Sequence, residues 1–337
     1  FDASAHVVIP GLINTHHHFY QTLTRACPPA LDKELFSWLK ALYPIWAHLD
    51  SAMLEVATEL ALAELLLSGC TCTADHHYIV SQHLPDAFDR QVRAATKLGM
   101  RVLITRGSMS LSVEDGGLPP KSVVQDAESI MADCVAVAER YHQSHEGAFV
   151  HIGMAPCSPF SVDLGLMQET AAEAKRLGLR LHTHLAETHD ENNYCQAKYG
   201  CRPLELLDKT GWLGDQTWLA HGIHFTDDEI KALGQAGTGI AHCPGSNLML
   251  ASGTCAAHDL ERHGAPVGIG VDGSASEDAS NLIEEVRRAW QVQRLRYGAA
   301  KISHKDVLRW ATLGSACCLG RDDIGSIAPG KQADLAL

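Results

Sequence analysis

The stretch "LRLHTHLAET", residues 179–188, decides the fold and points to the chemistry. A helical pattern ends just before it at Gly178, and glycine is the usual residue for the left-handed turn that closes a helix. An apolar run of strand length follows and ends in His184 and Glu187. Helix, glycine, short strand and polar strand end form one unit, and this unit recurs along the chain.

The unit is repeated at Gly69, Gly99, Gly237 and Gly264. Eight apolar runs of strand length alternate with helical patterns; they are residues 6–13, 70–74, 101–105, 150–155, 179–184, 217–220, 238–241 and 267–271. Such an alternation predicts an α/β fold with a parallel sheet covered on both faces. Eight units predict a (β/α)₈ TIM-type barrel, whose active site lies at the C-terminal ends of the strands. An open doubly wound sheet stays an alternative, because periodicity alone does not prove closure.

Two segments between the strands carry clear helix signals. Residues 51–67 predict a helix with one apolar stripe, formed by Leu54, Ala57, Leu60, Ala61 and Leu65. "TDDE", from Thr226 to Glu229, is a capping box that opens another helix.

Composition excludes several classes of partner. The 337 residues, 46% of them apolar, suit one large barrel. The 27 basic and 40 acidic residues give a net charge of -13, which argues against a nucleic-acid partner. No apolar run approaches the ~20 residues of a membrane helix, and no signal peptide is recognisable, so we expect a cytoplasmic protein that acts on a small molecule. The oligomeric state stays open, a homo-oligomer included. The 11 cysteines show no C-x-x-C spacing, so we expect buried thiols rather than disulfides.

Histidines stand at the ends of the predicted strands. "NTHHH" places His16 and His18 two residues apart, so both side chains point to one side, where they can bind one ion. His17 points to the other side, and we expect a structural role for it. In "HTHLAE", His184 shares a face with the deeper His182, which we expect to be a buried, hydrogen-bonded histidine.

Further polar residues follow the later strands. Glu187, three residues after His184, lies where a carboxylate can transfer a proton during metal-assisted hydrolysis. His221 ends "WLAH" and Asp272 ends "GIGVD"; an Asp before Gly and Ser is often a helix N-cap, but beside three histidines a ligand role is favoured. Three histidines and one carboxylate suit a catalytic zinc site, and iron is compatible. His242 and Asn247 of "AHCPGSN" are either rim residues that orient substrate or structural residues.

Together these motifs resemble the amidohydrolase superfamily almost end to end. The matching pieces, in order, are "PGLINTHHH", "HTHLAE", "LAHG", "HCPGSN" and "GVDGSAS". The final "GSIAPGKQADLAL" resembles the return of such chains into a small β-sandwich built from both termini. We therefore expect a barrel over residues 1–320 and the start of that return over 321–337, with the sandwich largely missing from this chain.

The resemblance implies roles for these residues. The ligands it implies for one divalent metal, zinc or iron, are His16, His18, His184 and Asp272. It implies that Glu187 shuttles a proton and that His221 orients the metal hydroxide and the developing oxyanion. It also implies that Asp272 accepts a proton from the attacking water.

The branch of the superfamily follows from two departures. The fourth-strand region "GAFVHIGMAPCSPFSVD" has no Lys, whereas dinuclear members commonly carry a carboxylated Lys there, so the resemblance implies the mononuclear deaminases. Gln21 and the aromatic of "LFSWL", Trp38, are similar to guanine deaminase, in which such a Gln reads the purine edge. Guanine deaminase, however, carries "PRF" where this chain has "APCSPF". Cys157 therefore lies near the position at which guanine deaminase has an Arg that holds the base.

The closest resemblance is to the 8-oxoguanine deaminase group, in "TRGSMSLSVEDGGLPPKSVVQD", "HTHLAETHDE" and "GIGVDGSASEDASNL". It implies hydrolysis of 8-oxoguanine to urate and ammonia, by attack of a metal-bound hydroxide on the amino-bearing ring carbon. Isoxanthopterin, guanine or hydroxytriazine aminohydrolases and another amide hydrolase are alternatives, and Glu187 argues against a barrel without catalysis. The residues expected to contact substrate are Gln21, Trp38, Cys157, His242 and Asn247. The Gly- and Pro-rich loop 107–120 is either a lid or an ordinary solvated loop.

Overall fold

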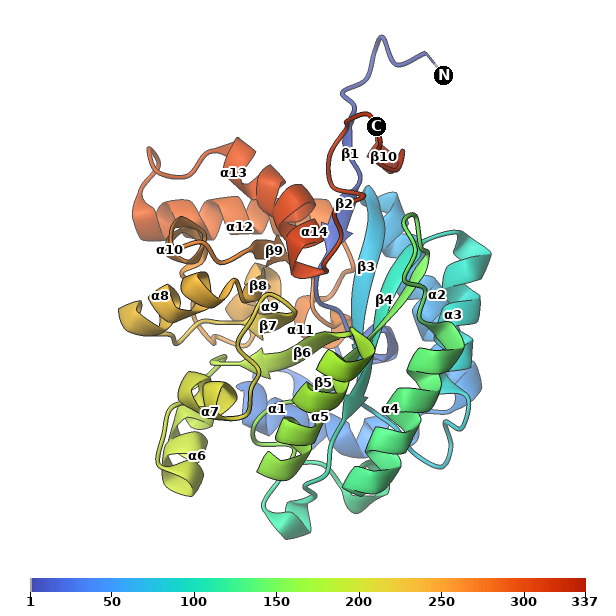
Figure 1. Cartoon of the computed structure of the whole chain (residues 1–337), viewed down its shortest axis with the longest axis vertical. Helices are drawn as coiled ribbons and strands as arrows, with labels where there is room; N and C mark the ends of the chain where they lie inside the picture. Colours follow the sequence, from blue (N-terminus) through green and yellow to red (C-terminus); the bar gives the residue numbers. More distant parts are fainter. Residues whose placement is uncertain (1) are drawn as a thin grey trace.

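The computed structural model describes residues 2–337, and eight parallel strands close into a barrel (Figure 1). The strands follow one another around the barrel in chain order, and closure occurs where Asn14 of the first pairs with Ile269 of the last. The predicted (β/α)₈ barrel is confirmed and the open doubly wound sheet is excluded. The barrel strands are β2 (Leu12–Asn14), β3 (Cys70–His77), β4 (Arg101–Ser108), β5 (Val150–Pro156), β6 (Arg180–Leu185), β7 (Thr217–His221), β8 (Gly239–His242) and β9 (Val267–Ile269).

The first predicted strand, residues 6–13, is wrong in extent. Residues 6–8 are exposed and outside any strand. β1 (Ile9–Pro10) pairs antiparallel with β10 (Leu335–Ala336) in a separate two-stranded sheet, so only β2 enters the barrel. The change occurs at Gly11, whose N–H donates to the carbonyl of Asp334 and which leaves no room for a side chain beside Thr71. An apolar run cannot reveal which part of it pairs with which sheet.

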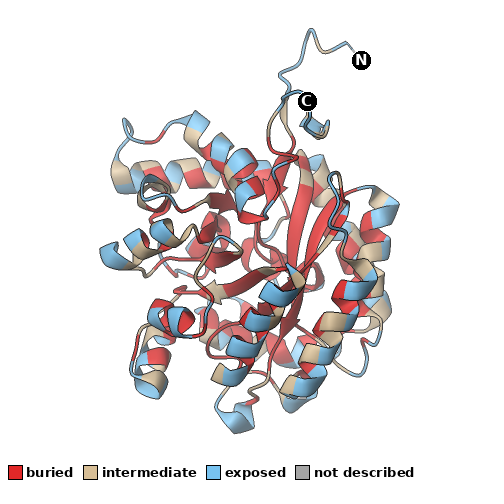
Figure 2. Ribbon diagram, viewed as in Figure 1, coloured by how far each residue is buried: buried red, intermediate tan, exposed pale blue. Residues whose placement is uncertain are grey.

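Helices surround the barrel, with their inward faces buried and their outward faces exposed (Figure 2). The longer helices are α1 (Leu35–Trp46), α2 (Ser51–Leu67), α3 (Ala87–Leu98), α4 (Ala127–Tyr141), α5 (Leu164–Leu177), α6 (His189–Tyr199), α8 (Asp227–Ala236) and α12 (Leu282–Tyr297). The shorter ones are α7 (Pro203–Lys209), α9 (Pro244–Met249), α10 (Ala257–Arg262), α11 (Ser274–Glu277), α13 (His304–Arg309) and α14 (Ser315–Cys318). Short 3₁₀ helices are η1 (Phe19–Thr24), η2 (Pro28–Ala30), η3 (Val113–Asp115) and η4 (Lys121–Val123), and η5 (Trp310–Gly314) is of the π type.

The local helix signals correspond to the observed helices. α2 spans the predicted 51–67, and the predicted capping box opens α8. Gly99, Gly178 and Gly237 end α3, α5 and α8 in left-handed conformations. The stripe on α2 needs one correction, because Leu60 is 41% exposed whereas the other four members are buried. Leu60 precedes Ala61 by one residue and therefore lies about 100° around the helix from it.

The cysteines carry no cross-links. All 11 are free; Cys317 is exposed, Cys27 is half-buried and the others are buried. Within residues 2–337, no helix combines the length and the apolar character that a membrane crossing needs.

Candidate active site

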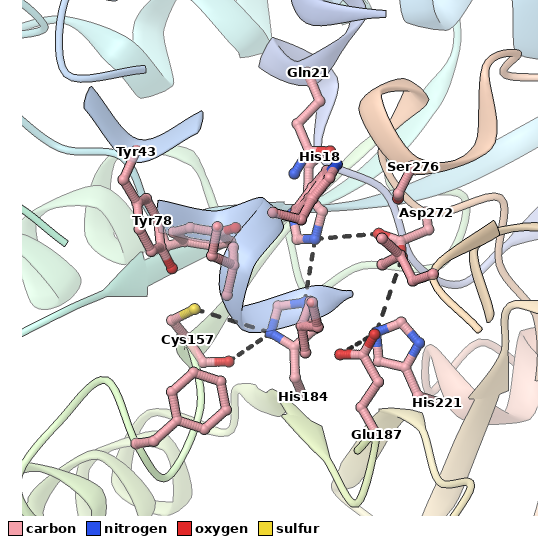
Figure 3. A pocket seen from close by; sticks show the side chains of 15 residues that line it. His18, Gln21, Tyr43, Tyr78, Cys157, His184, Glu187, His221, Asp272 and Ser276 are labelled. Carbon is pink, nitrogen blue, oxygen red and sulfur yellow. Dashed lines mark hydrogen bonds and ion pairs between the residues drawn. The ribbon is translucent and has the colours of Figure 1, made fainter. Parts of the chain in front are cut away.

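The C-terminal ends of four barrel strands bring the predicted metal-binding and catalytic side chains together (Figure 3). His16 and His18 follow β2, His184 lies in β6, His221 ends β7 and Asp272 follows β9. His184 is half-buried and the other four are buried. Figure 3 shows His18, His184, His221 and Asp272 directed at one common point.

The rings of His18 and His184 each have one nitrogen fixed by a backbone carbonyl. Nδ1 of His18 lies 2.7 Å from the oxygen of His76. Nδ1 of His184 lies 2.6 Å from the oxygen of Cys157. A carbonyl oxygen only accepts, so each Nδ1 donates its proton. Burial lowers the pKa of both histidines, so both rings are neutral and each Nε2 carries a lone pair.

His16 reaches the same state through a longer chain of hydrogen bonds. Nδ1 of His182 lies 2.8 Å from the carbonyl of Trp218, so His182 donates there and its Nε2 accepts. Nδ1 of His16 lies 2.8 Å from that Nε2 and must donate to it. Nε2 of His16 therefore holds a lone pair as well, and this buried atom has no hydrogen-bond partner.

These three lone pairs converge beside a carboxylate. The Nε2 atoms of His18 and His184 are 3.1 Å apart. Oδ1 of Asp272 lies 3.4 Å from Nε2 of His16 and 3.3 Å from Nε2 of His18. Lone pairs and a negative oxygen repel one another at these distances unless a cation lies between them. Imidazole nitrogens and carboxylate oxygens are typical ligands of a divalent metal, so this is a buried His/Asp metal-binding cluster. Its converging groups are His16, His18, His76 and His184, and His16, His221 and Asp272.

Glu187 lies at the edge of this cluster, on the turn that follows β6. Its side chain is buried, and its Oε2 lies 3.4 Å from Nε2 of His221. Burial and the charges of Asp272 and Glu191 raise the pKa of Glu187 well above its ordinary value. A carboxyl group in these surroundings can both hold and release a proton near neutral pH.

His221 is oriented from behind by α9. Its Nδ1 lies 3.0 Å from Nδ2 of Asn247, so the amide donates to Nδ1 and the ring proton resides on Nε2. That Nε2 faces Glu187 and lies 3.9 Å from Oδ2 of Asp272. His221 and Asp272 both have left-handed backbones, with φ of 73° and 64°. Strained backbone of this kind costs about 1–3 kcal/mol per residue and is concentrated at functional sites.

A pocket opens beside the metal-binding cluster, and three of the predicted substrate residues line it: Gln21, Trp38 and Cys157. Other members of its lining were not predicted; they are Leu35, Leu39, Tyr43, Tyr78, Phe160, Leu250 and Ser276. Leu35, Leu39 and Tyr43 lie with Trp38 on one face of α1. Their spacing of three and four residues is typical of one helix face and is the sequence signal that marks them as neighbours of Trp38.

Two predicted substrate residues lie outside the pocket lining. Nε2 of His242 lies 3.3 Å from Nε2 of Gln293. Asn247 contacts His221 rather than the pocket space. The loop 107–120 contributes no residue to the lining. β8 and α9, which carry His242 and Asn247, contribute no residue to the lining; Leu250, just after α9, is the nearest residue along the chain that does.

Two further histidines near the strand ends differ in orientation: His17 is directed away from the metal-binding cluster and His76 packs against it. His17 points away from the cluster; its Nε2 lies 2.8 Å from Oγ of Ser280, and its Nδ1 accepts the backbone N–H of His18. His76, in β3, stacks on His184 with ring centroids 4.7 Å apart. Its Nε2 donates to the carbonyl of Ala155, while its Nδ1 has no partner.

Comparisons with known proteins identify related chains. The model of the amidohydrolase family matches residues 7–337. The 8-oxoguanine deaminase of Pseudomonas aeruginosa is 60% identical over 337 residues, which cover 100% of this chain and 75% of that protein. An isoxanthopterin deaminase from an unknown prokaryotic organism is 37% identical over 355 residues, covering 100% of this chain and 74% of the relative.

A solved structure similar to this chain contains zinc. The atrazine chlorohydrolase of Arthrobacter aurescens TC1, crystallised in complex with zinc, superimposes with a TM-score of 0.93 at 32% identity. The match covers 98% of this chain and 75% of that chain.

Proposed function

The chain belongs to the amidohydrolase family and is a hydrolytic deaminase, and from this premise we propose that it converts 8-oxoguanine and water to urate and ammonia. The observation that carries this substrate is the 60% identity to an 8-oxoguanine deaminase over the whole chain. The 37% identity to an isoxanthopterin deaminase makes a pterin the second candidate.

The chemistry of the pocket supports a flat heterocycle with several polar edges. Trp38, Tyr43, Tyr78 and Phe160 supply aromatic surface. Oε1 of Gln21 is buried without a hydrogen-bond partner, as is the hydroxyl of Tyr43. An unpaired buried polar atom costs about 1–3 kcal/mol, and a base edge that bonds to these atoms removes that cost. The Cys157 thiol, whose pKa is raised to about 12 mainly by burial, remains a neutral donor for a substrate oxygen.

We propose zinc as the metal, with one ion per chain. The proposed ligands are His16, His18, His184 and Asp272, because three histidines and one carboxylate are a typical catalytic zinc set and a related structure contains zinc. β5 contains no Lys that could bridge a second ion. When bound, the ion lowers the pKa of a water toward neutrality. Elemental analysis is expected to find about one zinc per chain, and a value near two would contradict the mononuclear site.

The protein residues divide the proton transfers among them. Glu187, with its raised pKa, takes one proton from the attacking water and gives it to a ring nitrogen. The second proton of the water, taken first by Asp272, passes through Glu187 to the departing amino group, which leaves as ammonia. His221 presents its Nε2 proton to the oxygen that becomes negative at the amino-bearing carbon. Oδ1 of Asp272 accepts the N–H of Gly273 and faces the two histidine rings, whereas Oδ2 is free to accept a proton from the attacking water.

The test is an ammonia-release assay with 8-oxoguanine, guanine, isoxanthopterin, cytosine and hydroxyatrazine as substrates. We expect the highest kcat/KM for 8-oxoguanine, with Glu187→Gln as the background control. If isoxanthopterin is the best substrate, the second candidate replaces the first. If 8-oxoguanine is the poorest of the five, the proposed substrate is wrong.

A further inference from the structure

Glu191 is a buried carboxylate next to the active site that the reaction does not use directly. It lies in the first turn of α6, is 1% exposed and does not line the pocket. Its Oε1 accepts the backbone N–H of Ala186 at 3.0 Å, and its Oε2 accepts the backbone N–H of Glu187 at 3.1 Å. One side chain therefore holds both amides of the turn that carries the proposed proton shuttle.

That turn has an unfavourable backbone conformation. Ala186 has a φ of 53°, in the left-handed region that residues with a Cβ seldom adopt. Its carbonyl accepts the N–H groups of Ile223 and His224, each at 2.9 Å. Ala186 thus connects Glu191 on one side to the loop directly after His221 on the other. Two of the side chains that would move protons depend on the position of this one peptide.

An ordinary helix cap does not explain this geometry. In a capping box, the third helical residue returns a carboxylate to the N-cap amide, as Glu229 does for Thr226 in α8 at 2.7 Å. α6 begins with the same pattern, Thr188 followed by Glu191, and Thr188 accepts the N–H of Glu191. The carboxylate of Glu191, however, extends past the N-cap to the two amides before it.

We infer that Glu191 is a positioning residue that holds the Ala186–Glu187 turn in its left-handed form and so aims Glu187 at the reacting nitrogen. This inference rests on the proposed deaminase function for its catalytic consequence, but its structural part does not. Loss of the two hydrogen bonds would let the Ala186 backbone relax, and the Glu187 side chain would no longer be directed at the reacting nitrogen. Displacement of a catalytic group by about 1 Å can cost about 100-fold in rate.

The test compares Glu191→Gln with Asp306→Asn, which alters the exposed capping box of α13, where Asp306 accepts the N–H of Ser303. A Gln at 191 offers one acceptor and places an amide N–H against a backbone N–H. We expect kcat to fall about 10- to 100-fold, with KM and metal content within about twofold of the wild type. Asp306→Asn is expected to leave kcat within about twofold. Thr188→Val, which removes the cap hydrogen bond but keeps the carboxylate, is also expected to keep kcat.

Hydrogen–deuterium exchange provides a readout that does not depend on any substrate. In Glu191→Gln, the peptide spanning residues 183–190 is expected to exchange faster than in the wild type and in both control variants. If Glu191→Gln does not fold, Glu191→Asp, which keeps the charge but is too short to reach both amides, takes its place. Unchanged exchange, or an equal loss of kcat in Thr188→Val, would overturn the positioning role. Absence of ammonia release by the wild type would refute the proposed function while the exchange result still decides the structural part.

Discussion

Nε2 of His182 lies 2.8 Å from Nδ1 of His16 and accepts a hydrogen bond from it. His182 is in turn fixed by the carbonyl of Trp218, on whose ring it stacks at a centroid distance of 4.2 Å. Through these two hydrogen bonds, the backbone carbonyl of Trp218 in β7 keeps the proton of His16 on Nδ1. The lone pair of His16 is therefore on Nε2, which faces the metal site. His182 is therefore a buried histidine with an identifiable task.

Replacement of His182 by Phe keeps a ring against Trp218 but removes the acceptor for His16. The proton on His16 can then move to Nε2, so we expect the affinity for zinc to fall about 10- to 100-fold, as is typical when a partner of a metal-binding histidine is lost. Competition with a chromophoric chelator measures this affinity. His242→Phe, at a buried histidine outside the cluster, serves as the control and should bind zinc as the wild type does. Equal affinities in all three proteins would show that His182 does not set the state of His16.

Glu187→Gln separates proton transfer from metal binding. The variant cannot release or take up a proton at the side chain, so kcat is expected to fall about 100- to 10,000-fold, the range for loss of a general acid–base. Metal content should stay the same, because Glu187 is not among the groups whose ligand atoms converge. Elemental analysis and the ammonia assay on one preparation test both statements, with the exposed Glu205→Gln as the control. Retained turnover would remove Glu187 from the mechanism.

The barrel and its polar strand ends could be predicted because both are local patterns. The stretch from Gly178 through "LRLHTHLAE" contains a helix end, a strand and the polar residues His184 and Glu187 within a few positions. The two-residue period of a strand also separated His17 from its neighbours, and in the structure His17 points to Ser280.

Contacts between distant segments could not be predicted in this way. The link from His182 to His16 spans 166 residues, and the direction of the Glu191 carboxylate depends on the φ of Ala186. No periodicity encodes either feature. The same reason explains the error at residues 6–13, where the β1 segment pairs with residues close to the other end of the chain.

Gly273 is expected to control the position of Gln21. A Cβ added at residue 273 would overlap the side-chain amide of Gln21, and the φ of Gly273, -77°, is open to alanine. Gly273→Ala should therefore push the Gln21 amide away from its place in the pocket. We expect a loss in kcat/KM for 8-oxoguanine similar to that of Gln21→Ala, about 10-fold for one buried hydrogen bond. The double variant should be no worse than either single variant, because the two changes remove one interaction. Additive losses, or a loss of metal in Gly273→Ala, would contradict this coupling.

Asp75 is expected to make stability fall as the pH rises. Its carboxylate is buried and accepts the N–H of Phe19 at 2.7 Å and the amide of Gln91 at 2.6 Å. Burial raises its pKa from 3.8 to about 7, although the two hydrogen bonds lower it. Between these values the folded chain binds more protons than the unfolded chain, so raising the pH reduces the free energy of unfolding, by up to about 1.4 kcal/mol per pH unit. Above pH 7 this contribution becomes constant. Asp75→Asn lacks the titrating group, so urea unfolding of both proteins from pH 4 to 8 isolates the effect. The wild type should lose stability relative to Asp75→Asn up to about pH 7. A difference that does not change with pH would show that the carboxyl of Asp75 titrates alike in the folded and unfolded chains.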